Sequence, residues 1–184
     1  MFLIVGLGNV GKEYIDTPHN SGFLFLDILR ERLLDISSLQ VSEWINEKKL
    51  FQSEICKIKR DGEVIFLLQK PLTYMNRSGD AVRMIVEKFA PKSIILAHDD
   101  LDILLGRYKI GVEKSPKGHR GVLSVEEGIG RKDFLRVRIG VDNRGEREIP
   151  GEEYVLQRCS DAELSALTVS VKNAVEELLS TFEL

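Results

Sequence analysis

The sequence predicts a single-domain α/β fold, a three-layer sandwich with a mixed central β-sheet flanked by helices. Two observations lead to this prediction. Short apolar runs of strand length alternate along the chain with segments of helical periodicity. The length of 184 residues is most simply one domain, covering residues 1–184, with a substantial core of its own. With 43% hydrophobic and 30% charged residues, the composition is that of an ordinary globular protein.

The N-terminal part of the chain supplies a strand, a helix and a hairpin. Residues 2–5 are an apolar run that ends in the glycine-rich turn of residues 6–11, and a helical pattern starts near Ser21. Two extended runs follow, residues 51–59 and 63–69, and the Asp-Gly pair between them is a strong hairpin signal.

The middle of the chain continues the alternation. A helix is predicted over residues 78–90, because its apolar residues fall on one face and Pro91 ends it. Residues 93–97 are fully apolar and predict a buried strand. Residues 107–112 alternate between polar and apolar side chains and predict a half-exposed strand, and a helix follows over residues 121–129.

The C-terminal part adds one strand and a long helix. Residues 135–141 alternate cleanly, with Arg136 and Arg138 on the same side. Residues 142–153 are charged and contain Pro and Gly, so we expect a long surface loop. The last helix is predicted to begin at residues 160–163, whose Ser-Asp-Ala-Glu sequence is a capping box.

The turn at residues 6–11 fits the pattern G-x-G-x-x-G, which occurs in dinucleotide-binding folds. That motif requires a helix to open at the third glycine, so that the helix N-terminus meets a pyrophosphate. Here Gly11 is followed by a polar segment that contains Pro18. We therefore favour glycines that serve a tight turn. A nucleotide-binding enzyme is kept as an alternative, which a nucleotide-induced rise in melting temperature would support.

The composition also indicates the cellular compartment and whether a metal is expected. The apolar runs are too short to span a bilayer, and no secretory leader precedes the first strand, so we expect a cytoplasmic protein without membrane contact. Cys56 and Cys159 are isolated and read as buried thiols in a reducing compartment. The three histidines, His19, His98 and His119, show no metal-type spacing, so we expect no structural zinc.

Charge is unevenly distributed although the net charge is only −3. Residues 107–138 contain nine Lys and Arg against four Asp and Glu, whereas residues 145–184 contain nine acids against three bases. A basic segment in an acidic protein is a possible contact for a polyanion, but charge alone favours an ordinary solvated surface.

Three segments carry side chains suited to chemistry. The first holds Asn9, Tyr14 and His19 directly after the first strand, where α/β proteins keep their sites. The second is the run KPLTYMNRSG at residues 70–79, and the third is His-Asp-Asp-Leu-Asp at residues 98–102.

Each of the later two segments also has a purely structural interpretation. Asn76 and Ser78 are placed to cap the helix that follows them, and from sequence alone capping is the favoured interpretation. The acids of the third segment could bind a metal or orient a histidine, but Asp100 and Asp102 fit best as loop acids in water.

Taken together and in this order, these segments resemble the bacterial-type peptidyl-tRNA hydrolases. The similarity begins with Val-Gly-Leu-Gly-Asn at residues 5–9 and His-Asn-Ser-Gly at residues 19–22. It continues through residues 70–79 and 98–102 to Gly-His-Arg-Gly at residues 118–121, so that it covers nearly the whole chain.

The resemblance implies hydrolysis of the ester that joins a peptide to the 3′-terminal ribose of tRNA. It implies that His19 is a general base that activates water, and that Asp99 pairs with it to fix its tautomer. It also implies that the reaction uses no metal or other cofactor. A substrate-binding role is further implied for a group of polar side chains: Asn9, Tyr14, Tyr74, Asn76 and Arg120.

The resemblance also gives the basic segment a partner. Lys114, Lys117 and Arg136 are expected to contact tRNA phosphates, which steer binding without reading sequence. Arg120 stands where the family usually has asparagine, and an arginine there could reach a phosphate. We expect a monomer. The alternative in another class is a non-catalytic RNA-binding relative of the same fold.

Overall fold

The computed structural model describes residues 1–112 and 118–182. Its centre is one mixed sheet in the strand order β2-β4-β5-β1-β6-β8-β7, with β3 paired to β4. The strands are β1 (Phe2–Gly6), β2 (Gln40–Val41), β3 (Ile45–Glu47), β4 (Ser53–Arg60), β5 (Glu63–Pro71), β6 (Ser93–Leu104), β7 (Tyr108–Gly111) and β8 (Leu135–Asp142).

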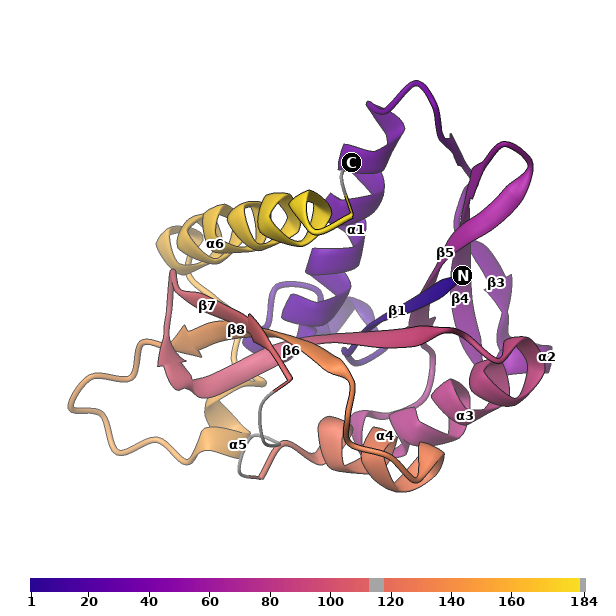
Figure 1. Ribbon diagram of the computed structural model, residues 1–184. Coiled ribbons are helices and arrows are strands. Elements are labelled where there is room, and N and C mark those ends of the chain that lie inside the picture. Colours follow the sequence, from indigo (N-terminus) through magenta and orange to yellow (C-terminus); the bar gives the residue numbers. More distant parts are fainter. Residues whose placement is uncertain (113–117, 183–184) are drawn as a thin grey trace.

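Helices cover both faces of this sheet, as Figure 1 shows. The helices are α1 (Ser21–Leu34), α2 (Lys48–Phe51), α3 (Ser78–Phe89), α4 (Arg120–Ile129), α5 (Gly151–Tyr154) and α6 (Asp161–Ser180), with short 3₁₀ turns η1 (Lys12–Tyr14), η2 (Pro18–Asn20) and η3 (Met75–Arg77). One core lies between the sheet and helices α1 and α6, and a second between the sheet and helices α3 and α4. The predicted three-layer α/β sandwich is therefore confirmed.

The sheet topology brings several chain segments to one edge. Strand β1 runs parallel to β5 and β6, and β6 runs parallel to β8. The segments that follow β1 and β5 therefore leave the sheet at the same edge, beside the carboxyl-terminal half of β6. These are the segments in which the sequence predicts a site.

The glycines of the first turn are explained by close packing of α1. A Cβ on Gly22 would lie 2.4 Å from the carbonyl oxygen of Ala97, and a Cβ on Gly6 would lie 2.2 Å from the carbonyl oxygen of Gly22. Gly11 has a φ of +135°, which side chains rarely adopt. It is followed by η1, and the first α-helix begins only at Ser21. A turn conformation thus explains Gly11, close packing against α1 explains Gly6, and no α-helix opens at the third glycine as a dinucleotide-binding motif requires.

Most of the predicted elements are present, with three differences. Strand β6 extends through Leu104, so residues 98–102 belong to the sheet and do not form a loop. The short elements β2, β3 and α2 were not predicted. The predicted surface loop after β8 contains the four-residue helix α5. The capping box of α6 is confirmed, because the Ser160 hydroxyl accepts from the backbone N–H of Glu163 and that glutamate bonds back to the Ser160 backbone.

No helix among residues 1–112 and 118–182 is both long and apolar enough to cross a membrane.

Candidate active site

A cavity of about 700 Å³ opens at the carboxyl edge of the parallel strands. Its walls come from the loop after β1, from η2, from η3, from β6 and from the N-termini of α4 and α5. Six of the side chains predicted for the site line it, namely Asn9, His19, Tyr74, Asn76, Asp99 and Arg120. The fold thus brings four separate motifs around one space.

His19 and Asp99 are in direct contact in this cavity. The Nδ1 atom of His19 lies 2.9 Å and 3.1 Å from the two carboxylate oxygens of Asp99. Asp99 is buried, whereas the His19 side chain keeps 14% of its surface exposed. The contact joins η2 to β6, and the imidazole presents its opposite edge, which carries Nε2, away from the carboxylate.

A second histidine, His119, holds the same carboxylate. Its Nε2 lies 2.9 Å from Oδ1 of Asp99, and its Nδ1 accepts from the backbone N–H of Val122 at 3.3 Å, which caps α4. His119 lies in the Gly-His-Arg-Gly motif, but no role in the site was predicted for it. The signal that could have found it is that every histidine of the chain lies in one of the motifs.

The charge of Asp99 determines which ring nitrogens of His19 and His119 carry a proton. Burial alone would raise the pKa of Asp99, but His19 and His119 outweigh burial and hold the pKa well below its usual range. An ionised carboxylate only accepts hydrogen bonds, so His19 donates from Nδ1–H and His119 donates from Nε2–H. Neutral His19 therefore carries its lone pair on Nε2, and both ring nitrogens of His119 are already engaged.

His19 also binds a proton more readily than an ordinary histidine. Burial lowers its pKa, but the charge of Asp99 and the hydrogen bond to it outweigh burial, so that the net shift is upward. His98 behaves in the opposite way. Burial lowers the pKa of His98 to about 3, so this ring is neutral, and its Nδ1 donates to the backbone carbonyl of Asp99 at 2.7 Å. Of the three histidines, His19 is the one equipped to accept a proton.

Asn9 is oriented by the backbone around it. Its Oδ1 accepts from the backbone N–H of Met75 at 3.1 Å, which assigns the amide so that the Nδ2 donor is the other end. Its own backbone exchanges two hydrogen bonds with the side chain of Asn20, at 2.8 Å and 3.0 Å. Asn9 can therefore donate a hydrogen bond to a ligand in the cavity that it lines.

Asn76 and Tyr74 lie on the exposed side of the cavity. The N-cap residue of α3 is Arg77, without a side-chain cap hydrogen bond, and the hydroxyl of Ser78 bonds to the carbonyl of Met75. The expectation that Asn76 and Ser78 cap the helix is therefore wrong. Asn76 is exposed where it lines the cavity, and Tyr74 is 72% exposed.

Tyr14 is not brought into this group. It is half-buried in η1 and is not among the residues that line the cavity, although the sequence analysis expected it there. Lys114 and Lys117, two of the predicted tRNA contacts, lie outside the described residues.

The prediction that Arg136 contacts tRNA is wrong. Its side chain is fully buried and bonds to the carboxylate of Glu126 at 2.8 Å, beneath α4. Alternation in β8 correctly placed Arg136 and Arg138 on one face, but α4 covers that face and excludes phosphate. Asp100 was likewise expected in water, yet it is buried and accepts from Arg138 at 2.7 Å. Asp102 is exposed, as expected.

Three side chains of the cluster have the chemistry of metal ligands. The ligand atoms of His19, Asp99 and His119 all lie within 4.8 Å of one another. Nδ1 of His19 and Nε2 of His119 both donate hydrogen bonds to the Asp99 carboxylate, so a cation bound to Asp99 would have to displace both N–H donors. The present geometry suits a hydrogen-bonded base better than a metal centre.

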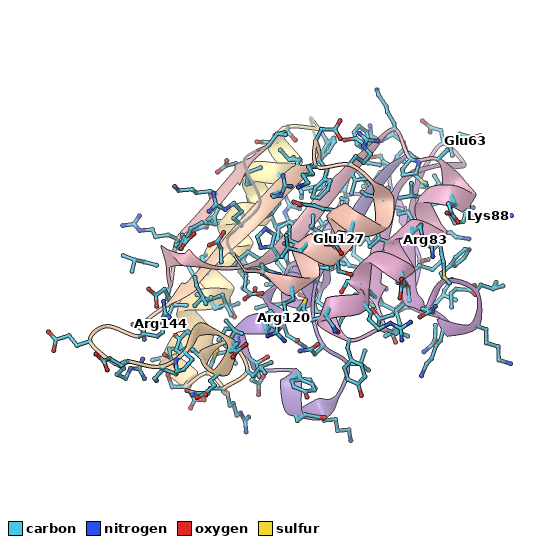
Figure 2. The ribbon with its side chains drawn as sticks, turned by 90° about the horizontal axis from the view of Figure 1, so that it is seen from below. Glu63, Arg83, Lys88, Arg120, Glu127 and Arg144 are labelled. Carbon is cyan, nitrogen blue, oxygen red and sulfur yellow. The ribbon has the colours of Figure 1, made fainter. Side chains whose placement is uncertain are left out.

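Arg120 and Glu152 meet across the cavity. The Arg120 guanidinium donates to the Glu152 carboxylate at 2.8 Å, and both residues line the cavity. Figure 2 shows Arg120 at the start of α4, on the side toward the segment that carries Arg144 and α5.

The fold and this site define a class of protein: an α/β sandwich whose sheet edge holds a histidine oriented by a buried carboxylate, the arrangement of a general base. A family model described as peptidyl-tRNA hydrolase matches residues 3–183. The chain belongs to the peptidyl-tRNA hydrolase family, as the motifs had indicated.

Individual relatives agree with this assignment. A peptidyl-tRNA hydrolase of Thermodesulfovibrio yellowstonii is 35% identical over 183 residues, which cover 97% of this chain and 91% of that protein. One from Aquifex aeolicus is 37% identical over 184 residues, with coverages of 99% and 90%. The crystal structure of peptidyl-tRNA hydrolase from Acinetobacter baumannii superimposes with a TM-score of 0.74 at 32% identity, covering 98% of this chain and 91% of that one.

Proposed function

We propose that this protein hydrolyses the ester between a peptide, or an N-blocked amino acid, and the 3′-terminal ribose of tRNA, and that His19 activates the attacking water without a metal ion. The observation that carries the proposal is the bond between His19 Nδ1 and the buried Asp99 carboxylate, which leaves Nε2 as the basic atom. The names of the relatives support the substrate, because they are peptidyl-tRNA hydrolases.

The reaction balances on His19 alone. Water attacks the ester carbonyl while its proton passes to Nε2, and Asp99 stabilises the imidazolium that forms. The tetrahedral intermediate then expels the ribose oxygen, which takes the proton from Nε2. The products are a peptide acid and a free tRNA 3′ end, and His19 returns to its neutral form.

The neighbouring side chains can bind the peptide, the oxyanion and the tRNA end that such a reaction involves. Asn9 Nδ2 and the Asn76 amide can donate to a carbonyl oxygen of the peptide or to the oxyanion that develops on the ester. Tyr74 offers an exposed ring on which a base at the tRNA end can stack. Arg120 can bind a phosphate.

His119 acts as a positioning residue in this proposal. It shares the Asp99 carboxylate with His19 and is itself fixed by the Val122 backbone N–H. Asp99 is thus held from the side of α4 while it orients His19 from the side of β6. Such support from a second layer keeps a base within the narrow geometry that proton transfer requires.

We further propose that the protein acts as a monomer in the cytoplasm. Free thiols support a reducing compartment, since Cys56 is buried and neither Cys56 nor Cys159 is in a disulfide. Light scattering of the purified protein would test the monomer directly, and a dimer mass would contradict it.

The function is tested by release of a peptide from N-blocked aminoacyl-tRNA by the purified protein, with EDTA present throughout. We expect release at a rate that EDTA does not change. No release, with tRNA still bound, would contradict hydrolysis and favour the non-catalytic RNA-binding alternative. Release that EDTA abolishes would contradict the metal-free mechanism.

A further inference from the structure

Several residues that line the cavity are joined in a closed circuit of contacts. His19 bonds to Asp99, and Asp99 bonds to His119 at the start of α4. The next residue, Arg120, bonds to Glu152 in α5. The circuit closes where the carbonyl oxygen of Val155, just after α5, accepts from the backbone N–H of His19 at 2.9 Å.

The links of this circuit differ in their exposure to solvent. The His19, Asp99 and His119 side chains are 14%, 3% and 6% exposed. The Arg120 and Glu152 side chains are 72% and 73% exposed. Water competes for an exposed ion pair, so this link opens at far lower cost than the buried ones. The circuit therefore has one weak point, and it lies between α4 and α5.

Other contacts hold both ends of that link in place. The Tyr154 hydroxyl, which is buried, donates to the carbonyl of Val141 at 3.0 Å and fixes α5 to β8. On the other side, the N-cap contact of His119 fixes the start of α4. Opening the pair thus requires rotation of two long side chains and no movement of the backbone.

We propose that Glu152 competes with the substrate for Arg120, and that it holds the Arg120 guanidinium at the cavity until a phosphate group near the 3′ end of tRNA replaces the carboxylate. This inference rests on the proposed function for the identity of the phosphate. Guanidinium binds carboxylate and phosphate with the same planar pair of donors, so one can exchange for the other. A ligand without a phosphate at this place leaves the pair closed and is unaffected by it, whereas a ligand that needs Arg120 must first displace Glu152, which weakens its binding.

The test compares two neighbouring variants that remove the same charge. Glu152→Gln removes the partner of Arg120, whereas Glu153→Gln alters the next residue of α5, which is exposed and does not line the cavity. For N-blocked aminoacyl-tRNA, we expect Glu152→Gln to lower KM by about two- to fivefold at low salt, the size expected for release of an exposed ion pair. We expect kcat to stay unchanged, and Glu153→Gln to leave both constants near the wild-type values.

A double-variant cycle shows whether the effect passes through Arg120. In the Arg120→Gln background, Glu152→Gln should give no further decrease in KM. The inference is overturned if Glu152→Gln and Glu153→Gln behave alike, if Glu152→Gln raises KM, or if its effect is the same without Arg120.

The dissociation constant of deacylated tRNA, measured by fluorescence anisotropy on the same variants, separates this inference from the proposed function. If the wild type binds tRNA but releases no peptide, the proposed function fails. A lower dissociation constant for Glu152→Gln than for Glu153→Gln would then still support the replacement of Glu152 by phosphate at Arg120. If the wild type is active and the dissociation constants of the two glutamate variants are equal, only the exchange fails.

Discussion

At the scale of single residues, the site is organised around one carboxylate. Asp99 accepts from His19 and from His119, and its backbone carbonyl accepts from His98. The ring centroids of His19 and His119 lie 5.1 Å apart, and those of His98 and His119 lie 5.0 Å apart. Because both ring nitrogens of His119 are engaged and His98 is fully buried outside the cavity lining, His19 is left as the ring that can exchange a proton with a ligand.

Asp99→Asn should therefore slow turnover by about 10²–10⁴-fold, the usual contribution of general base catalysis. The amide cannot hold His19 as an Nδ1–H donor with the strength of a carboxylate, and it does not stabilise the imidazolium. Single-turnover kinetics would measure the rate, and the dissociation constant of tRNA would serve as the control for folding. A rate close to the wild type would remove Asp99 from the mechanism.

The pH dependence follows from the direction of the His19 shift. The base must be neutral, so kcat/KM should fall as pH drops through the pKa of His19, at a midpoint above the value of about 6.5 for an ordinary histidine. Asp99→Asn removes the charge that raises this pKa, so its midpoint should lie at lower pH. A profile that is flat between about pH 5 and 8 would argue against a histidine base.

Sequence could predict part of this site and not the rest. The site residues His19, Asp99, Asn9 and Asn76 were predicted from motifs whose order resembles that of a known family. The role of His119 depends on where α4 begins relative to β6, which no local pattern encodes. The burial of Arg136 and Asp100 has the same origin, because alternation tells which side of a strand a residue faces but not what covers that side.

At the scale of elements, the site depends on how closely α1 approaches the sheet. His19 lies in η2, directly before α1, and Gly22 is pressed against Leu7 and Ala97. Neither glycine leaves room for a side chain, because a Cβ on Gly6 would meet the Gly22 carbonyl and a Cβ on Gly22 would meet the backbone of Ala97 and Leu7. Gly6 and Gly22 thus allow the start of α1, directly after His19, to lie close to the sheet that carries Asp99.

Gly22→Ala should consequently destabilise the protein and slow catalysis together. Its Cβ would lie 2.4 Å from the backbone nitrogen of Leu7, so α1 must move away from β1. A loss of about 1–3 kcal/mol in the free energy of unfolding is expected from overpacking of this kind. Urea unfolding would measure it, with Glu31→Ala, an exposed change in the same helix, as the control. Unchanged stability would show that the helix is not in close contact there.

The pair between β8 and α4 gives a second prediction for an element. Arg136→Met leaves the Glu126 carboxylate buried without its closest cation, and breaking a buried pair in this way costs about 3–5 kcal/mol. Arg131→Met, which alters an exposed arginine, should stay within about 0.5 kcal/mol of the wild type. If Arg136→Met instead weakened tRNA binding at unchanged stability, the surface role predicted from sequence would be restored.

At the scale of the whole molecule, an acidic protein is proposed to bind a polyanion. The net charge of the protein is −3, so the attraction between the protein and tRNA must come from local groups of basic side chains. KM for N-blocked aminoacyl-tRNA should therefore rise with salt concentration along a straight line in a double-logarithmic plot. Steady-state kinetics across a salt series would measure the slope. A KM that is independent of salt would mean that phosphate contacts contribute little.

The global architecture was the easier part to predict. Alternating strand and helix patterns determine the layers, and the parallel strands determine the edge at which the motifs meet. The elements that were missed, β2, β3, α2 and α5, have four residues or fewer. Such short elements depend on the neighbours that they pair with or pack against, which leave no periodic pattern in the sequence.

The central claim is that His19 is the base that activates water. It is tested most directly by the single-turnover release of peptide from N-blocked aminoacyl-tRNA by His19→Ala, measured beside the wild type in EDTA. We expect the wild type to release peptide without added metal, and His19→Ala to bind tRNA with unchanged affinity but release no peptide. Release by His19→Ala at the wild-type rate would contradict the claim.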